Sequence, residues 1–309
     1  MSTPLALRSV LGKYAEVAPL KTGAVKSDRV RLDFVEVEPI AGSFRRMLRD
    51  WEFDFCEMAI TTLALARAFE KPILGLPIVL HRGFHHGTLQ CLKISPLKGP
   101  GELKGKKVGV RAYSQTTGVW VRGILKSEYG LDHAGVTWVT TEDAHVAEYR
   151  DPPNVVRAAP GKTLRAMLTA GEIDATIALG GPDQGDLRTV IPDADAAATV
   201  WYRKTGIYPS NHTVVVKSDL ATANPWLAGE LYRMMVTAKE QARASGMTAP
   251  KSPAQTRLLA LVGDDALPYG MKANRASMEL LLRFAFDQKL IPRAYRLDEL
   301  FDPALAAST

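Results

Sequence analysis

The sequence predicts an α/β protein with two lobes around a cleft, and three observations support this. Apolar runs typical of short β-strands alternate with helical patterns over the first ninety residues. The same alternation returns over about 95–195, and the residues after Pro225 are mostly helical. Strands separated by helices are typical of βαβ units with parallel pairing, so two such stretches predict two sheets.

Short apolar or alternating segments predict the strands of the first stretch. They are LALRSV (5–10), VRLDFVEV (30–37), FDFC (53–56) and ILGLPIVL (73–80). Helices are expected between them, one where Phe44, Met47, Leu48 and Trp51 recur at helical spacing and one over 59–68.

The second stretch begins after the glycine- and proline-rich segment at 99–101. Strands are expected at 106–110 and 136–140, and a helix followed by a strand at 163–179. Between the first two strands, 115–129 predicts an amphipathic helix opened by Ser114. Farther on we expect a strand over 212–220 and helices over 226–245, 253–262 and 274–289.

Composition excludes several classes of protein. Of the 309 residues 46% are hydrophobic and 23% are charged, which is typical of globular chains and not of disordered or fibrous ones. The net charge of +6 is spread without a basic run, so we expect no nucleic-acid partner. Two cysteines, Cys56 and Cys91, cannot form a disulfide framework.

The N-terminal segment gives an expectation about location. Arg8, Lys13 and Glu16 interrupt its apolar residues, so there is no apolar core of a signal peptide. No uncharged apolar span of eighteen residues occurs elsewhere. We therefore expect a soluble cytoplasmic protein with no membrane partner.

Candidate functional residues lie where predicted strands end, because ligands of parallel sheets collect at the carboxyl ends of the strands. This predicts binding residues in the loops after 53–56, 73–80, 107–110 and 174–179. Arg82, His85 and His86 follow one strand and could bind a carboxylate and move a proton, although a solvated basic turn has the same pattern.

Glu57 and His212 also flank predicted strands. Glu57 could orient a histidine or accept a proton, or it could simply be an acid at a helix N-terminus. His212 could donate a proton or bind a metal, or it could be a histidine of the core.

A turn into the predicted helix 115–129 could bind an anion, since helix N-termini present free N–H groups. Simple helix capping is the alternative. Trp120 on this helix could stack on an aromatic ring or pack in the core, and Gly181 could allow a ligand to approach the backbone closely. The turn residues are Arg111, Tyr113, Gln115, Thr116 and Thr117.

Five segments in order along the chain resemble the 4,5-dihydroxyphthalate decarboxylase family, which has a type II periplasmic-binding-protein-like fold. The chain departs from the family pattern at His85, at Ala266-Leu267 and at Asn211. The segments are FDFCEMAITTLALA (53–66), RGFHHGTLQCL (82–92), GVRAYSQTTGVWVRGILKSEYGL (109–131), WYRKTGIYPSNHTVVVK (201–217) and GDDALPYGMKANRASMELLLRFAFDQKL (263–290).

The resemblance implies a discontinuous first lobe, 1–94 with 200–309, a second lobe over 95–199, and a helical C-terminal region. It implies a carbon–carbon lyase that converts 4,5-dihydroxyphthalate to protocatechuate and CO2. His86, His212 and Glu57 would be catalytic. Arg82, His85, Arg111, Tyr113, Gln115, Thr116, Thr117, Trp120 and Gly181 would bind substrate.

The resemblance leaves the cofactor open between none and a divalent metal ion, and it implies a homo-oligomer. His81, His133 and His145 lie outside the matched positions and are interpreted as surface residues.

The rival hypothesis is a solute-binding protein of the ABC-transporter type for a small carboxylate. A ligand-sensing domain is a third possibility, although no helix-turn-helix segment precedes the first strand.

Overall fold

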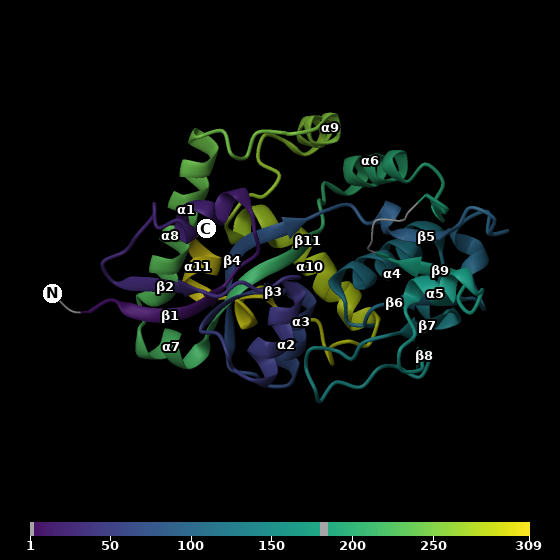
Figure 1. The fold of residues 1–309 in the computed structure, drawn as a ribbon, viewed down its shortest axis with the longest axis horizontal. Coiled ribbons are helices and arrows are strands. Elements are labelled where there is room, and N and C mark those ends of the chain that lie inside the picture. Colours follow the sequence, from purple (N-terminus) through teal and green to yellow (C-terminus); the bar gives the residue numbers. More distant parts are fainter. Residues whose placement is uncertain (1–2, 180–184) are drawn as a thin grey trace. The chain divides into compact units, whose positions relative to one another are not determined.

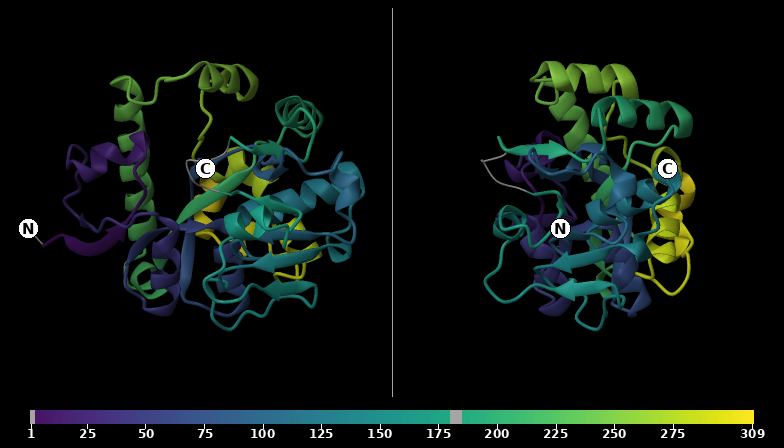
Figure 2. Two further views of the ribbon diagram at one scale, coloured as in Figure 1. Left: turned by 45° about the vertical axis from the view of Figure 1, so that its right-hand side comes forward. Right: turned by 90° about the vertical axis from the view of Figure 1, so that its right-hand side faces the viewer.

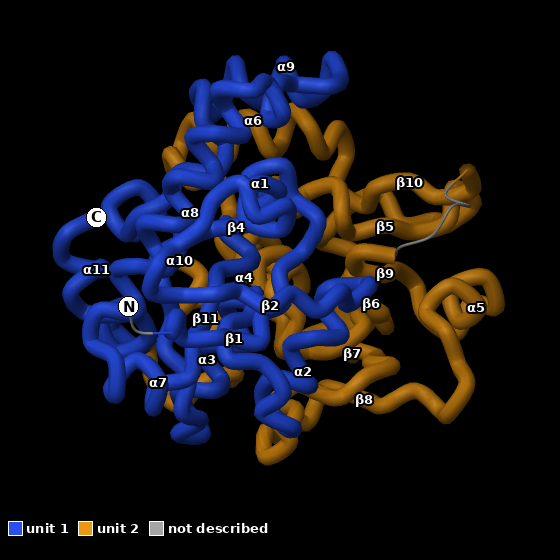
Figure 3. The backbone as a smooth tube through the Cα atoms, turned by 60° about the vertical axis from the view of Figure 1, so that its left-hand side comes forward, with its two compact units in different colours: residues 1–82, 210–279, 295–309 blue, residues 83–209, 280–294 orange. Residues whose placement is uncertain are grey.

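The computed structural model describes residues 3–179 and 185–309, and the chain divides into two compact units (Figures 1 and 3). The first unit contains 1–82, 210–279 and 295–309, and the second contains 83–209 and 280–294. The first unit is therefore discontinuous in sequence. Predicted Gly181 lies outside the described residues.

The first unit has a five-stranded sheet within the described residues, in the order β2-β1-β3-β11-β4. β1 pairs in parallel with β2 and β3, whereas β11 pairs antiparallel with β3 and β4. β11 therefore returns the chain to the centre of this sheet. The strands are β1 (Leu5–Val10), β2 (Val30–Phe34), β3 (Phe55–Ala59), β4 (Ile73–Arg82) and β11 (Ser210–Lys217).

Helices cover both faces of this sheet. α8 (Leu227–Ala244) buries Leu227, Leu231 and Met235, one stripe at helical spacing, in the same core as Phe55 of β3. The next residue, Cys56, points to the opposite face because strand side chains alternate, and its Sγ contacts Ser43 of α2. Figure 2 shows α8 as a long green helix beside the purple N-terminal segment.

The remaining helices of the first unit have four to ten residues each. They are α1 (Ala18–Lys21), α2 (Ala41–Arg49), α3 (Ile60–Ala68), α7 (Ser218–Ala223), α9 (Pro253–Val262) and α11 (Pro303–Ser308). In α9 no residue is buried.

The second unit has a six-stranded mixed sheet within the described residues, in the order β10-β5-β9-β6-β7-β8. α5 (Leu164–Thr169) packs Met167 and Leu168 against Val139 and Leu187 of this sheet. The strands are β5 (Leu89–Leu92), β6 (Lys107–Val110), β7 (Thr137–Thr140), β8 (Val155–Arg157), β9 (Ala175–Ile177) and β10 (Leu187–Thr189).

Two longer helices complete the second unit, α4 (Thr116–Tyr129) and α6 (Ala194–Thr205). α10 (Met271–Asp287) starts in the first unit and ends in the second. A Cβ on Gly123 of α4 would overlap the ring of Phe284. Glycine at this position therefore allows α4 and the second half of α10 to approach closely.

The limits of the units differ from the ranges expected from the sequence. Residues 83–94 belong to the second unit because β5 pairs with β9 and β10 there. Residues 280–294 also belong to it, because Phe284 and Gln288 contact α4. Hydrogen-bond pairing and side-chain packing set these limits, and neither is visible in the strand and helix periods.

Most predicted elements are present, with shifted ends. α4 begins at Thr116 after Gln115, whose side chain makes no cap hydrogen bond, so the prediction that Ser114 opens the helix is wrong. β8 lies between the elements expected at 136–140 and 163–179, where no strand is predicted, and the strand expected over 212–220 ends at Lys217. Among the described residues no helix is both long and apolar enough to span a bilayer.

Candidate functional site

A wholly buried carboxylate lies at the centre of the first unit's sheet. Glu57 on β3 is 0% exposed, and three donors point at its two oxygens. The Gly12 N–H donates to Oε2 at 2.8 Å, and the Tyr14 hydroxyl donates to Oε1 at 2.7 Å. Nδ1 of His212 lies 2.7 Å from the same Oε1. The buried acid is thus fully hydrogen-bonded.

These partners meet because of strand pairing. β3 lies between β1 and β11. His212 is paired with Ala59, two residues from Glu57, so both side chains lie on the same face of the sheet. Gly12 and Tyr14 follow the end of β1, and a Cβ on Gly12 would lie 2.6 Å from the Tyr14 ring. Glycine there leaves room for the ring that donates to Glu57.

The hydrogen bonds decide the charge of this carboxyl group. Burial would raise the pKa of Glu57, but the hydrogen bond and charge interaction with His212, followed by the hydrogen bonds from Gly12 and Tyr14, outweigh it and hold the pKa below its usual value. Burial and then the charge of Glu57 raise the pKa of Tyr14. Glu57 is therefore ionised and Tyr14 stays a donor at neutral pH.

An ionised carboxylate only accepts hydrogen bonds, so Nδ1 of His212 carries the proton of this contact. Nε2, when it carries no proton, is the acceptor nitrogen of the ring, and among residues 3–179 and 185–309 it has no hydrogen-bond partner. The His212 side chain is 19% exposed. The pair can take a proton from a molecule that reaches Nε2, and Glu57 stabilises the imidazolium that forms.

A second histidine, His81 near the end of β4, lies beside this pair. Its ring centroid is 5.2 Å from that of His212, and the planes are tilted by 37°. Val214 of β11 pairs with Leu76 of β4, and His212 pairs with His81. The pairing therefore advances by five residues along β4 while it advances by two along β11, which is a register shift. This register shift, which includes Pro77, brings His81 next to His212.

His85 and His86 lie in the second unit, after β4. His86 is 1% exposed, its ring meets Trp201 edge-on at 5.7 Å, and its Nδ1 has no hydrogen-bond partner in the described chain. Desolvation lowers the pKa of His86 to about 4. His85 is also buried, with its ring nearly parallel to that of Trp120 at 6.4 Å.

The predicted turn before α4 is present in the second unit. Tyr113 and Thr116 are buried, and Arg111 lies 3.7 Å from Glu142 in an ion pair. Trp120 is 0% exposed and contacts Trp201 and Phe284 edge-on, which is the packing alternative for this residue. The substrate-binding roles of Arg111, Tyr113, Gln115, Thr116 and Thr117 stay predictions.

The structure joins Glu57 and His212 by a hydrogen bond, and in the second unit it places the ring of His85 against that of Trp120. Arg82 ends β4 and pairs with Ser210 in the first unit's sheet. Reasoning from the sequence missed Gly12 and Tyr14, although they follow strand 5–10, whose carboxyl end lies beside that of β3. It also missed the contact of His81 with His212.

The prediction of a surface position for His133 is wrong, because His133 is buried and its carbonyl accepts a hydrogen bond from Trp138 Nε1.

Among the described residues no three His, Cys, Asp or Glu side chains form a group that could hold a metal ion.

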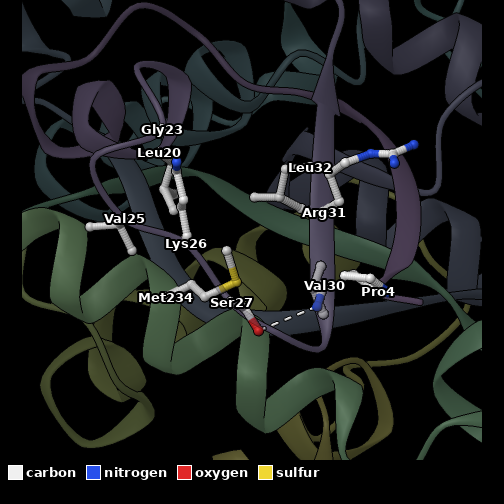
Figure 4. Close-up of a pocket in the computed structure, with 10 residues that line it drawn as sticks. All are labelled: Pro4, Leu20, Gly23, Val25, Lys26, Ser27, Val30, Arg31, Leu32 and Met234. Atoms are coloured by element: carbon white, nitrogen blue, oxygen red, sulfur yellow. Dashed lines mark hydrogen bonds between the residues drawn. The ribbon is translucent and has the colours of Figure 1, made fainter. Parts of the chain in front are cut away.

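A separate pocket of about 360 Å³ lies in the first unit (Figure 4). Leu20, Val25 and Met234 provide apolar walls. Of its two cationic residues, Arg31 is paired with Asp33 in two hydrogen bonds. The pocket contains neither Glu57 nor His212, so it offers no comparable proton-transfer group.

Comparison with solved structures defines the class of the fold. The alkanesulfonate-binding protein SsuA from Xanthomonas axonopodis pv. citri matches with a TM-score of 0.59 and 16% identity, over 97% of this chain and 99% of that one. SsuA from Escherichia coli matches with 0.59 and 15%, over 99% and 100%. The protein therefore has an α/β fold of the periplasmic-binding-protein type, with two mixed sheets, as the resemblance predicted.

This fold also occurs in an enzyme. The desulfurization enzyme DSZB matches with a TM-score of 0.54 and 16% identity, over 98% of each chain. No protein-family model matches the chain.

The sequence relatives are more specific. A 4,5-dihydroxyphthalate decarboxylase from Comamonas testosteroni is 29% identical over 327 aligned positions, covering 97% of each chain. One from Pseudomonas putida is 31% identical over 212 positions, covering 64% of this chain and 82% of that one. The chain belongs to the 4,5-dihydroxyphthalate decarboxylase family and is a homologue of carboxy-lyases.

Proposed function

We propose that the protein is a non-oxidative decarboxylase of a hydroxylated aromatic carboxylate or dicarboxylate, with 4,5-dihydroxyphthalate as substrate and protocatechuate and CO2 as products. The observation that carries the proposal is the Glu57–His212 pair, in which a buried ionised carboxylate orients an imidazole whose Nε2 has no hydrogen-bond partner in the described part of the chain. The relatives named as 4,5-dihydroxyphthalate decarboxylases support the reaction class.

The chemistry requires one proton to leave an oxygen and one to reach a carbon. Each carboxylate of 4,5-dihydroxyphthalate has a hydroxyl para to it. Nε2 of His212 takes the proton of that hydroxyl, and electron density moves to the ring carbon that bears the carboxylate. An acid then protonates this carbon, the bond to the carboxylate breaks, and CO2 leaves. The electron pair of that bond restores the aromatic phenolate, which recovers its proton from His212.

Glu57 stabilises the transient imidazolium of His212, and Tyr14 and Gly12 keep the carboxylate in place. His86 is the predicted acid for the ring carbon. Because its pKa is lowered to about 4, it is neutral at pH 7 and needs a substrate carboxylate nearby to raise that pKa. Arg82 and Arg111 stay the predicted partners of the substrate carboxylates.

The competing function is that of a binding protein for a small carboxylate, favoured by the two structural matches that are themselves binding proteins. The same residues would then bind an aromatic acid without turnover.

One experiment separates the two functions. Purified protein is incubated with hydroxylated benzoates and phthalates, with and without divalent ions, while thermal shift and CO2 release are measured. We expect CO2 release by the wild type and a loss of at least about 100-fold in His212→Ala, whose binding persists. Binding without CO2 release by the wild type would establish the binding protein instead, and equal rates in both forms would remove His212 from the mechanism.

A further inference from the structure

His81 provides a second imidazole beside the proposed base. Its ring centroid lies 5.2 Å from that of His212, and the two residues are paired across β4 and β11. In the described part of the chain His81 makes no hydrogen bond through either ring nitrogen. The site thus contains two neighbouring imidazoles, each with an acceptor nitrogen that no described residue occupies.

The environment keeps His81 uncharged. Although the residue is exposed, desolvation by the surrounding chain, the largest cause of the shift, lowers its pKa to about 4. A neutral imidazole has one acceptor nitrogen and one N–H donor. At neutral pH His81 can therefore accept one hydrogen bond and donate another.

A metal ion fits the pair of His81 and His212 less well than an aromatic diol does. A cation bound by His81 and His212 would need a third ligand, and the nearest carboxylate, Glu57, already accepts three hydrogen bonds. The described residues contain no group of three possible metal ligands. Two imidazole rings side by side, each able to accept a hydrogen bond, fit two adjacent hydroxyl groups on one aromatic ring.

We propose that His81 is the specificity-determining residue for the second hydroxyl group of an ortho-dihydroxy aromatic acid. This inference rests on the proposed function. His212 takes the proton of the hydroxyl para to the departing carboxylate, and His81 accepts a hydrogen bond from the neighbouring hydroxyl.

The test compares two substrates that differ by one hydroxyl group, 4,5-dihydroxyphthalate and 4-hydroxyphthalate. kcat/KM is measured for both with the wild type and with His81→Leu, His81→Gln and His145→Leu. Leucine removes the acceptor, glutamine restores one, and His145 of the second unit provides the matched control.

We expect His81→Leu to lower kcat/KM about tenfold for the diol and to leave the monohydroxy acid nearly unchanged. His81→Gln recovers part of the preference, and His145→Leu behaves as the wild type. Equal losses for both substrates, or no loss, overturn the inference, while the proposed function stands if His212→Ala still abolishes turnover.

If the wild type releases no CO2 from either acid, the proposed function fails, and the inference is tested by binding. Calorimetric dissociation constants for the two acids then replace kcat/KM. A preference for the diol that His81→Leu removes supports the role of His81, and an unchanged ratio overturns it.

Discussion

Replacing Glu57 by glutamine changes the charge of the buried pair while keeping its size. The carboxylate accepts hydrogen bonds from Gly12, Tyr14 and His212, and all three partners are donors. An amide has only one acceptor oxygen, and its NH2 group donates. In Glu57→Gln at least one of these partners must therefore lose its acceptor or turn from donor to acceptor.

Each orientation of the amide has its own cost. With NH2 toward Gly12, a buried backbone N–H loses its acceptor, which costs about 1–3 kcal/mol of unfolding free energy. With NH2 toward His212, the imidazole must accept at Nδ1 and carry its proton on Nε2. It then cannot take a proton from substrate, so turnover falls at least about 100-fold.

Denaturant unfolding and kcat/KM for CO2 release measure these two effects. Glu36→Gln is the matched control, since Glu36 pairs with Lys21 and its side chain is 57% exposed. We expect less than about 1 kcal/mol for this control and unchanged turnover. A folded Glu57→Gln protein with wild-type stability and wild-type turnover would refute the reasoning.

Three further predictions concern Tyr14, Gly123 and His86. Tyr14→Phe removes one donor to Glu57 and should cost about 1–2 kcal/mol of unfolding free energy in denaturant titrations, and no change would show that the hydroxyl contributes nothing. Gly123→Ala places a methyl group against Phe284 and should destabilise the protein by about 1–3 kcal/mol of unfolding free energy. The control, Gly229→Ala in α8, has open space around it and should be neutral or stabilising by up to about 1 kcal/mol. Equal effects of the two substitutions would contradict the packing argument. The pKa of His86 is about 4 in the folded protein against an ordinary 6.5, so the unfolded chain binds more protons between these values and stability falls as pH decreases from 6.5 to 4. Removing the group in His86→Gln should reduce that fall by about 3 kcal/mol in unfolding titrations across this range, and an identical pH dependence would exclude the shift.

The strands and helices could largely be predicted because their periods are local. The runs at 5–10 and 73–80 became β1 and β4, and the helix expected at 253–262 became α9 with the same limits. β5, β8, β10 and α6 were not predicted as elements. The three strands have three or four residues each, too few for an alternating pattern to be distinctive.

Among the site residues, Glu57 and His212 could be selected from the sequence, since each flanks a predicted strand and has a side chain suited to proton transfer. The donors to Glu57 could not. Gly12 and His212 are 45 and 155 positions away along the chain, and only the order of strands in the sheet brings them to one carboxylate.

The sequence by itself determined the fold class, the two sheets and the residue types available for chemistry, because hydrophobic periodicity and strand ends are properties of short segments. The tertiary structure decided which of these residues act together. It made Glu57 a buried, ionised acceptor of three hydrogen bonds, and it brought His81 beside His212 through a register shift between β4 and β11. Charge state and neighbourhood depend on desolvation and on pairing between distant strands, and these exist only once the chain has folded.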